Sequence, residues 1–370
     1  MLNPTPSVLF FTLKIFSATG GIEKVCKLAG KALYEIYGNN LEVFSMHDET
    51  QDAKDNPYVP QKIYHAFAGN KIMASLKAIA AGRKKNIVIL SHINLLTVGG
   101  IIKKINPKVK LILFTHGIEV WQPMSRKRKR LLHGCDRVIS VSHFTRQKLI
   151  DVQGADAAKC VVLNNCLDPF LARPTPMQKP ADLLRQYKLE KTDIILMTLT
   201  RLAITERHKG YDKVILAIQS LQKKQQQRIV YLIAGKYTED EKKHIFQLAE
   251  NAMVSVVLTG FIDDHELPRY FALADMYIMP SKKEGFGITF IEAMYYGLPV
   301  IGGNADGSID ALDNGNFGLP VNPDSITEIE NAIEIMIQNR AAYQVDGEKL
   351  LKKFGFETYK EKLGKLLMNI

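Results

Sequence analysis

The sequence has few cysteines and no long apolar run. It contains four cysteines, at Cys26, Cys135, Cys160 and Cys166. They are too few for a disulfide framework in a chain of 370 residues, and their spacing matches no zinc pattern. No run approaches the ~18 apolar residues that a membrane-spanning helix needs. The apolar stretch 8–16 lacks a basic leader and contains Lys14, which argues against a signal peptide. No Asp-x-Asp triplet is present to hold a metal ion. The few cysteines and the missing apolar runs predict a reduced, cytoplasmic protein, and the missing triplet is consistent with a protein that works without a metal.

Acidic residues are scarce in one half of the chain. Residues 1–170 contain 24 Lys and Arg against 12 Asp and Glu, whereas residues 171–370 contain 25 against 26. The basic half could face nucleic acid, an anionic membrane surface or an acidic ligand. A nucleic-acid-binding protein predicts cations interleaved with aromatic residues. The longest cationic run contains no aromatic residue, so we expect no nucleic-acid partner.

The length and the hydrophobic pattern predict two α/β domains. At ~150 residues per domain, 370 residues favour two. Short apolar runs alternate with segments of helical period, which predicts parallel sheets covered on both faces. In the first half the expected strands are 7–13, 41–46, 87–90, 109–115, 137–141 and 161–163, with helices such as 22–37 and 70–85 between them.

The alternation starts again at residue 193. The expected strands are 194–199, 228–234, 254–258, 276–279 and 299–301, and the expected helices are 211–223, 238–251, 265–273 and 287–296. The segment before this restart contains Pro169, Pro174, Pro176 and Pro180 and reads as a connector. We therefore expect domains at 1–170 and 193–345, a linker at 171–192 and a C-terminal helix at 346–370.

The stretch 274–301 carries the most chemical information. A predicted strand ends at Pro280, a polar turn follows, and a helix then runs to about residue 296. In open α/β sheets ligands bind at this carboxyl edge of the strands, and a helix N-terminus there favours an anion. Gly285 and Gly287 let the backbone approach a ligand closely.

Two carboxylates frame this turn. Glu284 precedes the helix, and Glu292 lies eight residues later, about two helical turns along. A carboxylate that accepts hydrogen bonds from neighbouring hydroxyls is a common way to hold a ribose or hexose diol. The sequence therefore indicates a nucleotide or sugar site, with Glu284 at its mouth and Glu292 further inside.

Four motifs of this stretch resemble a family signature. Pro280-Ser281, Glu284-Gly-Phe-Gly287, Glu292-Ala-Met294 and Gly297-Leu-Pro-Val300 are similar to the signature of retaining nucleotide-sugar glycosyltransferases of the GT-B architecture, in the fourth glycosyltransferase sequence family. The resemblance implies an α/β fold of two doubly wound Rossmann-like domains that face each other across a cleft. The acceptor would bind the first domain and the nucleotide-sugar the second, and the C-terminal helix would pack back on the first.

The resemblance also implies roles for residues of this stretch. Glu284 would act on the donor hexose, as a catalytic residue, and Glu292 would hold the nucleotide ribose. Backbone amides would hold phosphate or sugar oxygens. The donor-binding residues around these amides are Gly285, Phe286, Gly287, Ile288 and Thr289.

Two cations earlier in the chain fit the same family. Arg201 ends a predicted strand and Lys209 precedes a helix, which resembles the family's Arg…Lys-Gly element. Two cations on a diphosphate leaving group would stabilise its developing charge, so we expect both to bind the donor and to be catalytic. The segment between them is longer than in the family, so Arg207 or His208 remains an alternative to Lys209.

The first half supplies further candidates. Gly20 and Gly21 follow the first predicted strand and resemble the family's glycine loop, which approaches the donor phosphates and sugar. His116 follows the predicted strand 109–115 at its carboxyl edge, and the resemblance implies contact with the transferring hexose near the reacting carbon. Asp306 and Asp310 stand where the family has a glycine and a glutamate, so no donor contact is expected from them.

A run of five cations lies just beyond the His116 loop. It consists of Arg126, Lys127, Arg128, Lys129 and Arg130. One hypothesis is a solvated helix face. The other is a contact with anionic lipid headgroups or with a diphosphate-linked lipid acceptor.

The resemblance implies a hexosyltransferase without a cofactor. It would move a hexose from a UDP- or GDP-sugar to a saccharide or lipid-linked acceptor, in the synthesis of cell-surface polysaccharide or glycolipid. A nucleotide-sugar epimerase and a phosphorylase are the alternatives on the same fold and site. We expect the protein in the cytoplasm, at the inner face of the membrane.

Overall fold

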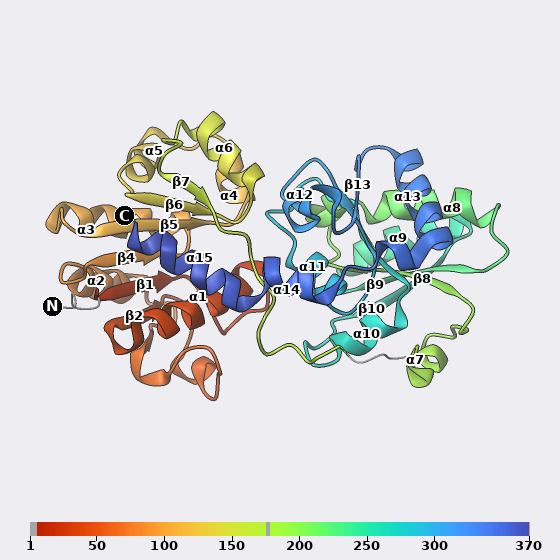
Figure 1. Ribbon diagram of the computed structural model, residues 1–370, viewed down its shortest axis with the longest axis horizontal. Helices are drawn as coiled ribbons and strands as arrows, with labels where there is room; N and C mark the ends of the chain where they lie inside the picture. Colours follow the sequence, from red (N-terminus) through yellow and green to blue (C-terminus); the bar gives the residue numbers. More distant parts are fainter. Residues whose placement is uncertain (1–5, 175–177, 370) are drawn as a thin grey trace. The chain divides into compact units, whose positions relative to one another are not determined.

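The computed structural model describes residues 6–174 and 178–369 (Figure 1). They form two units. The first contains the residues up to 168 and those from 354 onward, and the second contains residues 169–353. Three parts of the expected domain plan lie outside the described residues: 1–5 of the first domain, Pro176 with its neighbours in the connector, and Ile370 of the C-terminal helix.

The first unit is built on a seven-stranded parallel sheet with the strand order β3-β2-β1-β4-β5-β6-β7. Its strands are β1 (Val8–Thr12), β2 (Leu41–Ser45), β3 (Tyr64–Ala66), β4 (Ile87–Leu90), β5 (Lys110–Thr115), β6 (Arg137–Ser140) and β7 (Cys160–Val162). Its helices are α1 (Gly21–Tyr37), α2 (Lys71–Gly82), α3 (Leu96–Ile105), α4 (Ile118–Trp121), α5 (Arg126–His133), α6 (His143–Gln153) and α15 (Phe356–Met368).

Both faces of this sheet are buried, as β1 demonstrates. Val8 and Phe10 point into a core that includes side chains of α1 and α15. Leu9 and Phe11 point into the opposite core, which includes side chains of α2 and α3. Because successive side chains of a strand point to opposite faces, a strand covered on both sides reads as a continuous apolar run.

The second unit is built on a six-stranded parallel sheet with the order β10-β9-β8-β11-β12-β13. Its strands are β8 (Ile194–Leu199), β9 (Ile229–Ala234), β10 (Ser255–Gly260), β11 (Met276–Met279), β12 (Val300–Gly303) and β13 (Leu319–Val321). Its helices are α7 (Ala181–Gln186), α8 (Tyr211–Gln222), α9 (Glu239–Ala252), α10 (Leu267–Leu273), α11 (Ile288–Tyr295), α12 (Ser308–Ala311) and α13 (Ile326–Asn339), and α14 (Gly347–Phe354) follows them.

Helices cover both faces of this second sheet as well. On one face, Ile194 and Leu196 of β8 share a core with side chains of α8 and α13. On the other face, Tyr277 of β11 packs edge-on against Phe290 of α11, with 5.7 Å between the ring centroids. The prediction of two doubly wound α/β units is therefore confirmed. β3 and β13 were not predicted, because neither is a continuous apolar run: His65 interrupts β3 and Pro320 interrupts β13.

Two stretches contain more elements than expected. They are 171–192, expected as a linker, and 346–370, expected as one helix. Residues 178–192 include α7 of the second unit, where Leu183 is buried and Tyr187 bonds the Tyr270 hydroxyl at 2.9 Å. At the C-terminus α14 ends before Gly355, and α15 then packs on α1 in the first unit. Within the described ranges, no helix is both long and apolar enough to cross a membrane.

Candidate active site

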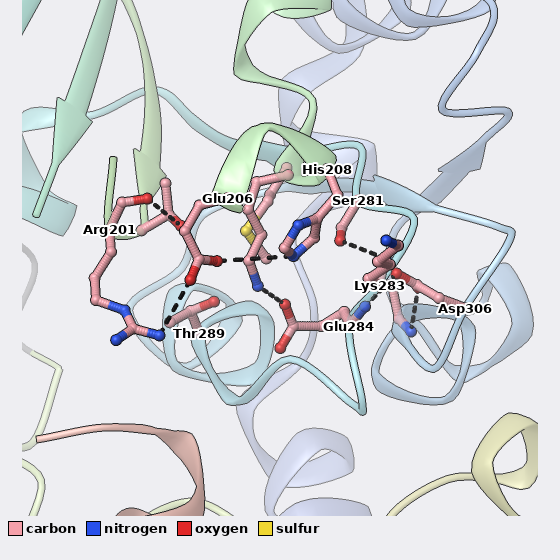
Figure 2. Close-up of polar contacts among 12 residues, drawn as sticks. Arg201, Glu206, His208, Ser281, Lys283, Glu284, Thr289 and Asp306 are labelled. Carbon is pink, nitrogen blue, oxygen red and sulfur yellow. Dashed lines mark hydrogen bonds and ion pairs between the residues drawn. The ribbon is translucent and has the colours of Figure 1, made fainter. Parts of the chain in front are cut away.

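The turn between β11 and α11 lies at the carboxyl edge of the second sheet (Figure 2). β11 ends at Met279, and α11 begins at Ile288 after a turn that starts with Pro280-Ser281. Gly287 has φ 88°, and a Cβ on it would stand 2.4 Å from the ring of Phe290. Only glycine fits this position, so the residue is required for the turn to reach the start of α11.

Glu284 is the most strongly fixed residue of this turn. Its backbone N–H donates to Asp306 Oδ2 at 2.6 Å, and its carbonyl accepts from the Gly307 N–H at 2.9 Å. Its side-chain carboxylate forms an ion pair with Lys209 Nζ. Backbone and side chain are thus held by different residues, and the ion pair engages Oε2, which leaves Oε1 outside that pair.

Asp306, to which no role was assigned from the sequence, anchors this arrangement. Its side chain is buried, and Oδ1 also accepts from the Ser308 N–H at 2.9 Å. Burial raises the pKa of Asp306 to about 6. The departure from the family pattern at this position was the available signal. Its consequence is a carboxylate that accepts hydrogen bonds from the backbone N–H groups of Glu284 and Ser308.

Arg201 precedes a short 3-10 helix, η5 (Ile204–Lys209), and Lys209 is its last residue. The Arg201 side chain is 77% exposed, and its Nη2 lies 3.1 Å from Oε1 of Glu206, which is 17% exposed. Glu206 Oε2 also lies 3.7 Å from His208 Nε2. Burial, with Lys209 nearby, lowers the pKa of His208. Figure 2 shows Glu206 between the arginine and the histidine. Each of the two predicted cations therefore has a carboxylate partner.

The alternative cation Arg207 points into a different network. Its Nε lies 2.9 Å from Glu241 Oε1 and its Nη2 lies 3.0 Å from Glu241 Oε2. The Tyr211 hydroxyl also donates to Glu241, at 2.8 Å, and Glu241 is buried. A bidentate pair with a buried carboxylate is costly to break. Of the three candidates, Lys209 is the one that contacts Glu284.

Helix α11 and the turn before it contain the remaining donor-binding candidates of this unit. The side chains of Phe286 and Ile288 are buried, so only their backbone can meet a ligand. The Thr289 hydroxyl accepts from the Tyr277 hydroxyl at 2.8 Å. Glu292 is 2% exposed, which excludes a solvated helix residue. The first N–H groups of a helix lack intrahelical acceptors, and they carry the positive end of its dipole.

The glycine loop of the first unit is held by another buried carboxylate, Asp48. The loop leads from β1 to Gly20, and α1 begins at Gly21. Asp48 Oδ2 accepts from the Ile15 and Phe16 N–H groups at 2.8 and 3.0 Å. Burial alone would raise the pKa of Asp48, but hydrogen bonds from Ser17, Tyr64 and these backbone groups lower it. Asp48 was missed; its place after β2, at the carboxyl edge, was the available signal.

His116 lies where β5 ends, as expected from the sequence. Its Nε2 lies 2.6 Å from the Ser91 carbonyl oxygen, to which it donates. Within the described chain its buried Nδ1 has no hydrogen-bond partner. Its backbone N–H donates to Glu119 Oε1 at 2.5 Å, and Gly117, with φ 142°, follows. In the neutral ring this leaves Nδ1 as an acceptor at the sheet edge.

The five cations form most of α5. Ser125 caps the helix, and its hydroxyl accepts from the Arg128 N–H at 3.4 Å. Arg126, Lys127, Arg128 and Arg130 are exposed, and Lys129 is half-buried, with Nζ 2.8 Å from the Val152 carbonyl. Four of the five cations therefore face solvent.

Comparison with known proteins identifies the family. Residues 19–169 match Glycosyltransferase Family 4, and residues 181–360 match Glycosyl transferases group 1. The structure of HepE from Anabaena with UDP and glucose superposes with a TM-score of 0.78 at 19% identity, over 98% of this chain and 100% of that one. A glycosyltransferase from Rickettsia africae superposes with a TM-score of 0.77 at 16% identity, over 99% and 100%. The chain belongs to the family-4 glycosyltransferases of the GT-B architecture.

Curated relatives match over shorter stretches. A GDP-mannose-dependent alpha-(1-6)-phosphatidylinositol monomannoside mannosyltransferase from Mycobacterium tuberculosis is 31% identical over 62% of this chain and 61% of the relative. The serotype-specific mannosyltransferase WbdA from Escherichia coli is 24% identical over 56% of this chain and 25% of the relative. The chain thus spans less than two thirds of each relative's length.

Proposed function

We propose that the protein is a retaining hexosyltransferase. It moves a hexose from a UDP- or GDP-sugar to a saccharide or lipid-linked acceptor, in the synthesis of cell-surface polysaccharide or glycolipid. The observation that carries the proposal is the Lys209–Glu284 ion pair beside the start of α11. A nucleotide-sugar needs cations and amide donors for its diphosphate and a carboxylate for its sugar hydroxyls, and this turn supplies all three. Two mannosyltransferases among the relatives support the substrate class.

The proposal assigns a role to each donor-binding candidate of the second unit. Arg201 and Lys209 bind the diphosphate, together with amides around Gly285, Phe286, Gly287, Ile288 and Thr289. Glu284 accepts hydrogen bonds from the donor hexose, and Glu292 accepts them from the ribose. In the structure Arg201 pairs with Glu206 and Lys209 with Glu284. The incoming diphosphate takes over the two cations.

The first unit contributes Gly20, Gly21 and His116. The two glycines begin α1 and bring backbone toward the donor phosphates. Because His116 Nε2 donates to a carbonyl, Nδ1 is the ring nitrogen that contacts a hydroxyl of the transferring hexose. This contact orients the sugar and stabilises positive charge near the reacting carbon.

The reaction breaks one bond and forms one. The bond between the anomeric carbon and the diphosphate oxygen breaks, and the electron pair leaves with the diphosphate. The acceptor oxygen bonds the same carbon on the same face, and its proton passes to the departing diphosphate oxygen. Arg201, Lys209 and the helix dipole stabilise the developing charge in place of a metal ion. In this proposal the reaction uses no cofactor and involves no nucleic acid. We place the protein at the cytoplasmic face of a membrane.

Donor binding is tested first, by thermal shift with UDP, GDP and ADP. A ligand at 100 times its dissociation constant stabilises by about 2.7 kcal/mol, which the melting temperature reports. The proposal expects a shift with UDP or GDP.

A product assay with and without acceptor then separates transfer from epimerisation and phosphorolysis. Arg201→Ala should lower turnover by ~10²-fold, whereas Arg185→Ala on α7 should not. An Arg201→Ala enzyme with unchanged turnover refutes the assigned role.

A further inference from the structure

Three neighbouring helices of the first unit have no acidic residue. They are α2, α3 and α5, and α3 contacts both of the others. Arg128 of α5 also reaches Asn94, just before α3, with 3.3 Å between Nη2 and Oδ1. All three helices contribute to the same core under one face of the sheet. From residue 67 to residue 135 the chain contains fourteen Lys and Arg and a single acidic residue, Glu119.

Large apolar side chains stand exposed among these cations. On α2, Ile72 is 76%, Met73 46% and Leu76 60% exposed, and on α3, Ile101 is 42% and Ile105 54% exposed. Ile72 and Leu76 are four residues apart, as are Ile101 and Ile105, so each pair lies on one side of its helix. We use the name basic–apolar face for these five side chains together with the exposed cations of the three helices, which are Lys71, Lys77, Lys104, Arg126, Lys127, Arg128 and Arg130. Figure 1 shows α2 and α3 next to each other in this unit.

The second unit also has exposed apolar residues, but they lie on helices with more acidic than basic residues. Phe246 on α9 is 42% exposed and Ile335 on α13 is 40% exposed. Helix α9 contains four Asp and Glu against two Lys, and α13 contains three Glu and no Lys or Arg. Exposed apolar side chains alone therefore do not distinguish the first unit from the second. The first unit differs because its exposed apolar side chains lie on helices whose charged residues are all Lys and Arg.

We infer that the basic–apolar face docks on the surface of an anionic lipid bilayer. A protein partner of one net charge would also suit the cations, but exposed isoleucine, leucine and methionine on helices flanked by Lys and Arg match the boundary between headgroups and acyl chains. The apolar side chains enter that boundary, and the cations contact the headgroups. The face thereby extends the α5 run into a larger surface and deepens the proposed use of a lipid-linked acceptor, on which it rests.

The test is co-sedimentation of the full chain with two kinds of vesicle. One kind is pure phosphatidylcholine, and the other contains 30% phosphatidylglycerol. Wild type should sediment with the anionic vesicles only, and less so at high salt, because exposed charges are screened. Ile72→Ser with Leu76→Ser should lower the apparent partition coefficient by about tenfold or more. The matched control, Phe246→Ser with Ile335→Ser, should leave it unchanged.

Three results would overturn the inference. One is wild type that does not sediment with anionic vesicles. Another is equal partitioning of the Ile72/Leu76 variant and wild type. The third is a variant that alters the oligomeric state in light scattering, which would make the face a contact between copies of the chain. Unchanged melting of the variant shows that it is folded. The UDP and GDP thermal shift is read separately: its failure rejects the proposed function, and failure of sedimentation alone rejects only the docking surface.

Discussion

Replacing Glu206 with glutamine should strengthen the binding of a nucleoside diphosphate. The Glu206 carboxylate lies 3.1 Å from Arg201 Nη2, so it would compete for the cation with a diphosphate bound as proposed. Glutamine keeps the size of the side chain and removes the charge. Most changes near a binding site weaken binding, so the direction of this effect is a strong test of the competition.

The structure sets the size of the effect. Arg201 is 77% exposed, and an ion pair with so exposed a partner contributes about 0.2–1 kcal/mol. The carboxylate would also repel a diphosphate bound at Arg201. At roughly 6 Å in a water-like medium this repulsion adds about 0.7 kcal/mol. Losing both terms strengthens binding by about 1–1.7 kcal/mol, which is roughly five- to twentyfold in the dissociation constant.

Isothermal titration of UDP and GDP at two salt concentrations measures this change. At low salt Glu206→Gln should bind the preferred diphosphate more tightly than wild type, and at 0.5 M salt the difference should shrink, because screening weakens both terms. Glu239→Gln is the control. It changes the net charge equally but lies on α9, where Glu239 is 71% exposed and pairs with Lys242. Weaker or unchanged binding by Glu206→Gln at low salt refutes the competition.

Three further predictions test other parts of the site. Lys209→Met should lower kcat/KM by about 10²-fold, because one donor to the leaving group is lost; Lys213→Met, which removes a pair with the exposed Asp324, should not. Asp306→Asn should change the pH dependence of stability. Because burial raises the folded-state pKa of Asp306 to about 6, its contribution to stability is full below pH ~4 and is lost as pH rises through 6. Urea unfolding should therefore show the variant gaining up to about 3 kcal/mol relative to wild type between pH 4 and 7.5, and a constant difference contradicts this. EDTA should leave transfer unchanged in a product assay, and loss of activity that Mg²⁺ restores would refute metal independence.

Much of the fold was predictable because its strands are buried on both sides. The run 7–13 reads as continuously apolar since Val8 and Phe10 face one core and Leu9 and Phe11 the other. β3 and β13 give no such run, because His65 interrupts the first and Pro320 the second. Their pairing depends on the neighbouring strand, which a local pattern does not contain.

Candidate site residues could be proposed from the sequence where they lie close together along the chain. Glu284 and Glu292 lie around a helix start, and the structure has that helix at Ile288–Tyr295. The choice among Arg207, His208 and Lys209 was not predictable, because it depends on tertiary contacts. Glu241, which holds Arg207, lies 34 residues away along the chain, and Glu284 lies 75 residues from Lys209. Nothing within 201–209 encodes either contact.

The residues missed from the sequence share one physical task. Asp48, Glu119 and Asp306 each accept backbone N–H groups from a turn at a carboxyl sheet edge: those of Ile15 and Phe16, of His116, and of Glu284. Such turns leave donors that no strand or helix satisfies, and a buried donor without a partner is costly. A carboxylate in this task needs no fixed spacing from the turn that it holds. Motif reasoning therefore proposes candidates for substrate contact, whereas the contacts by which these carboxylates hold the turns are defined by the folded chain.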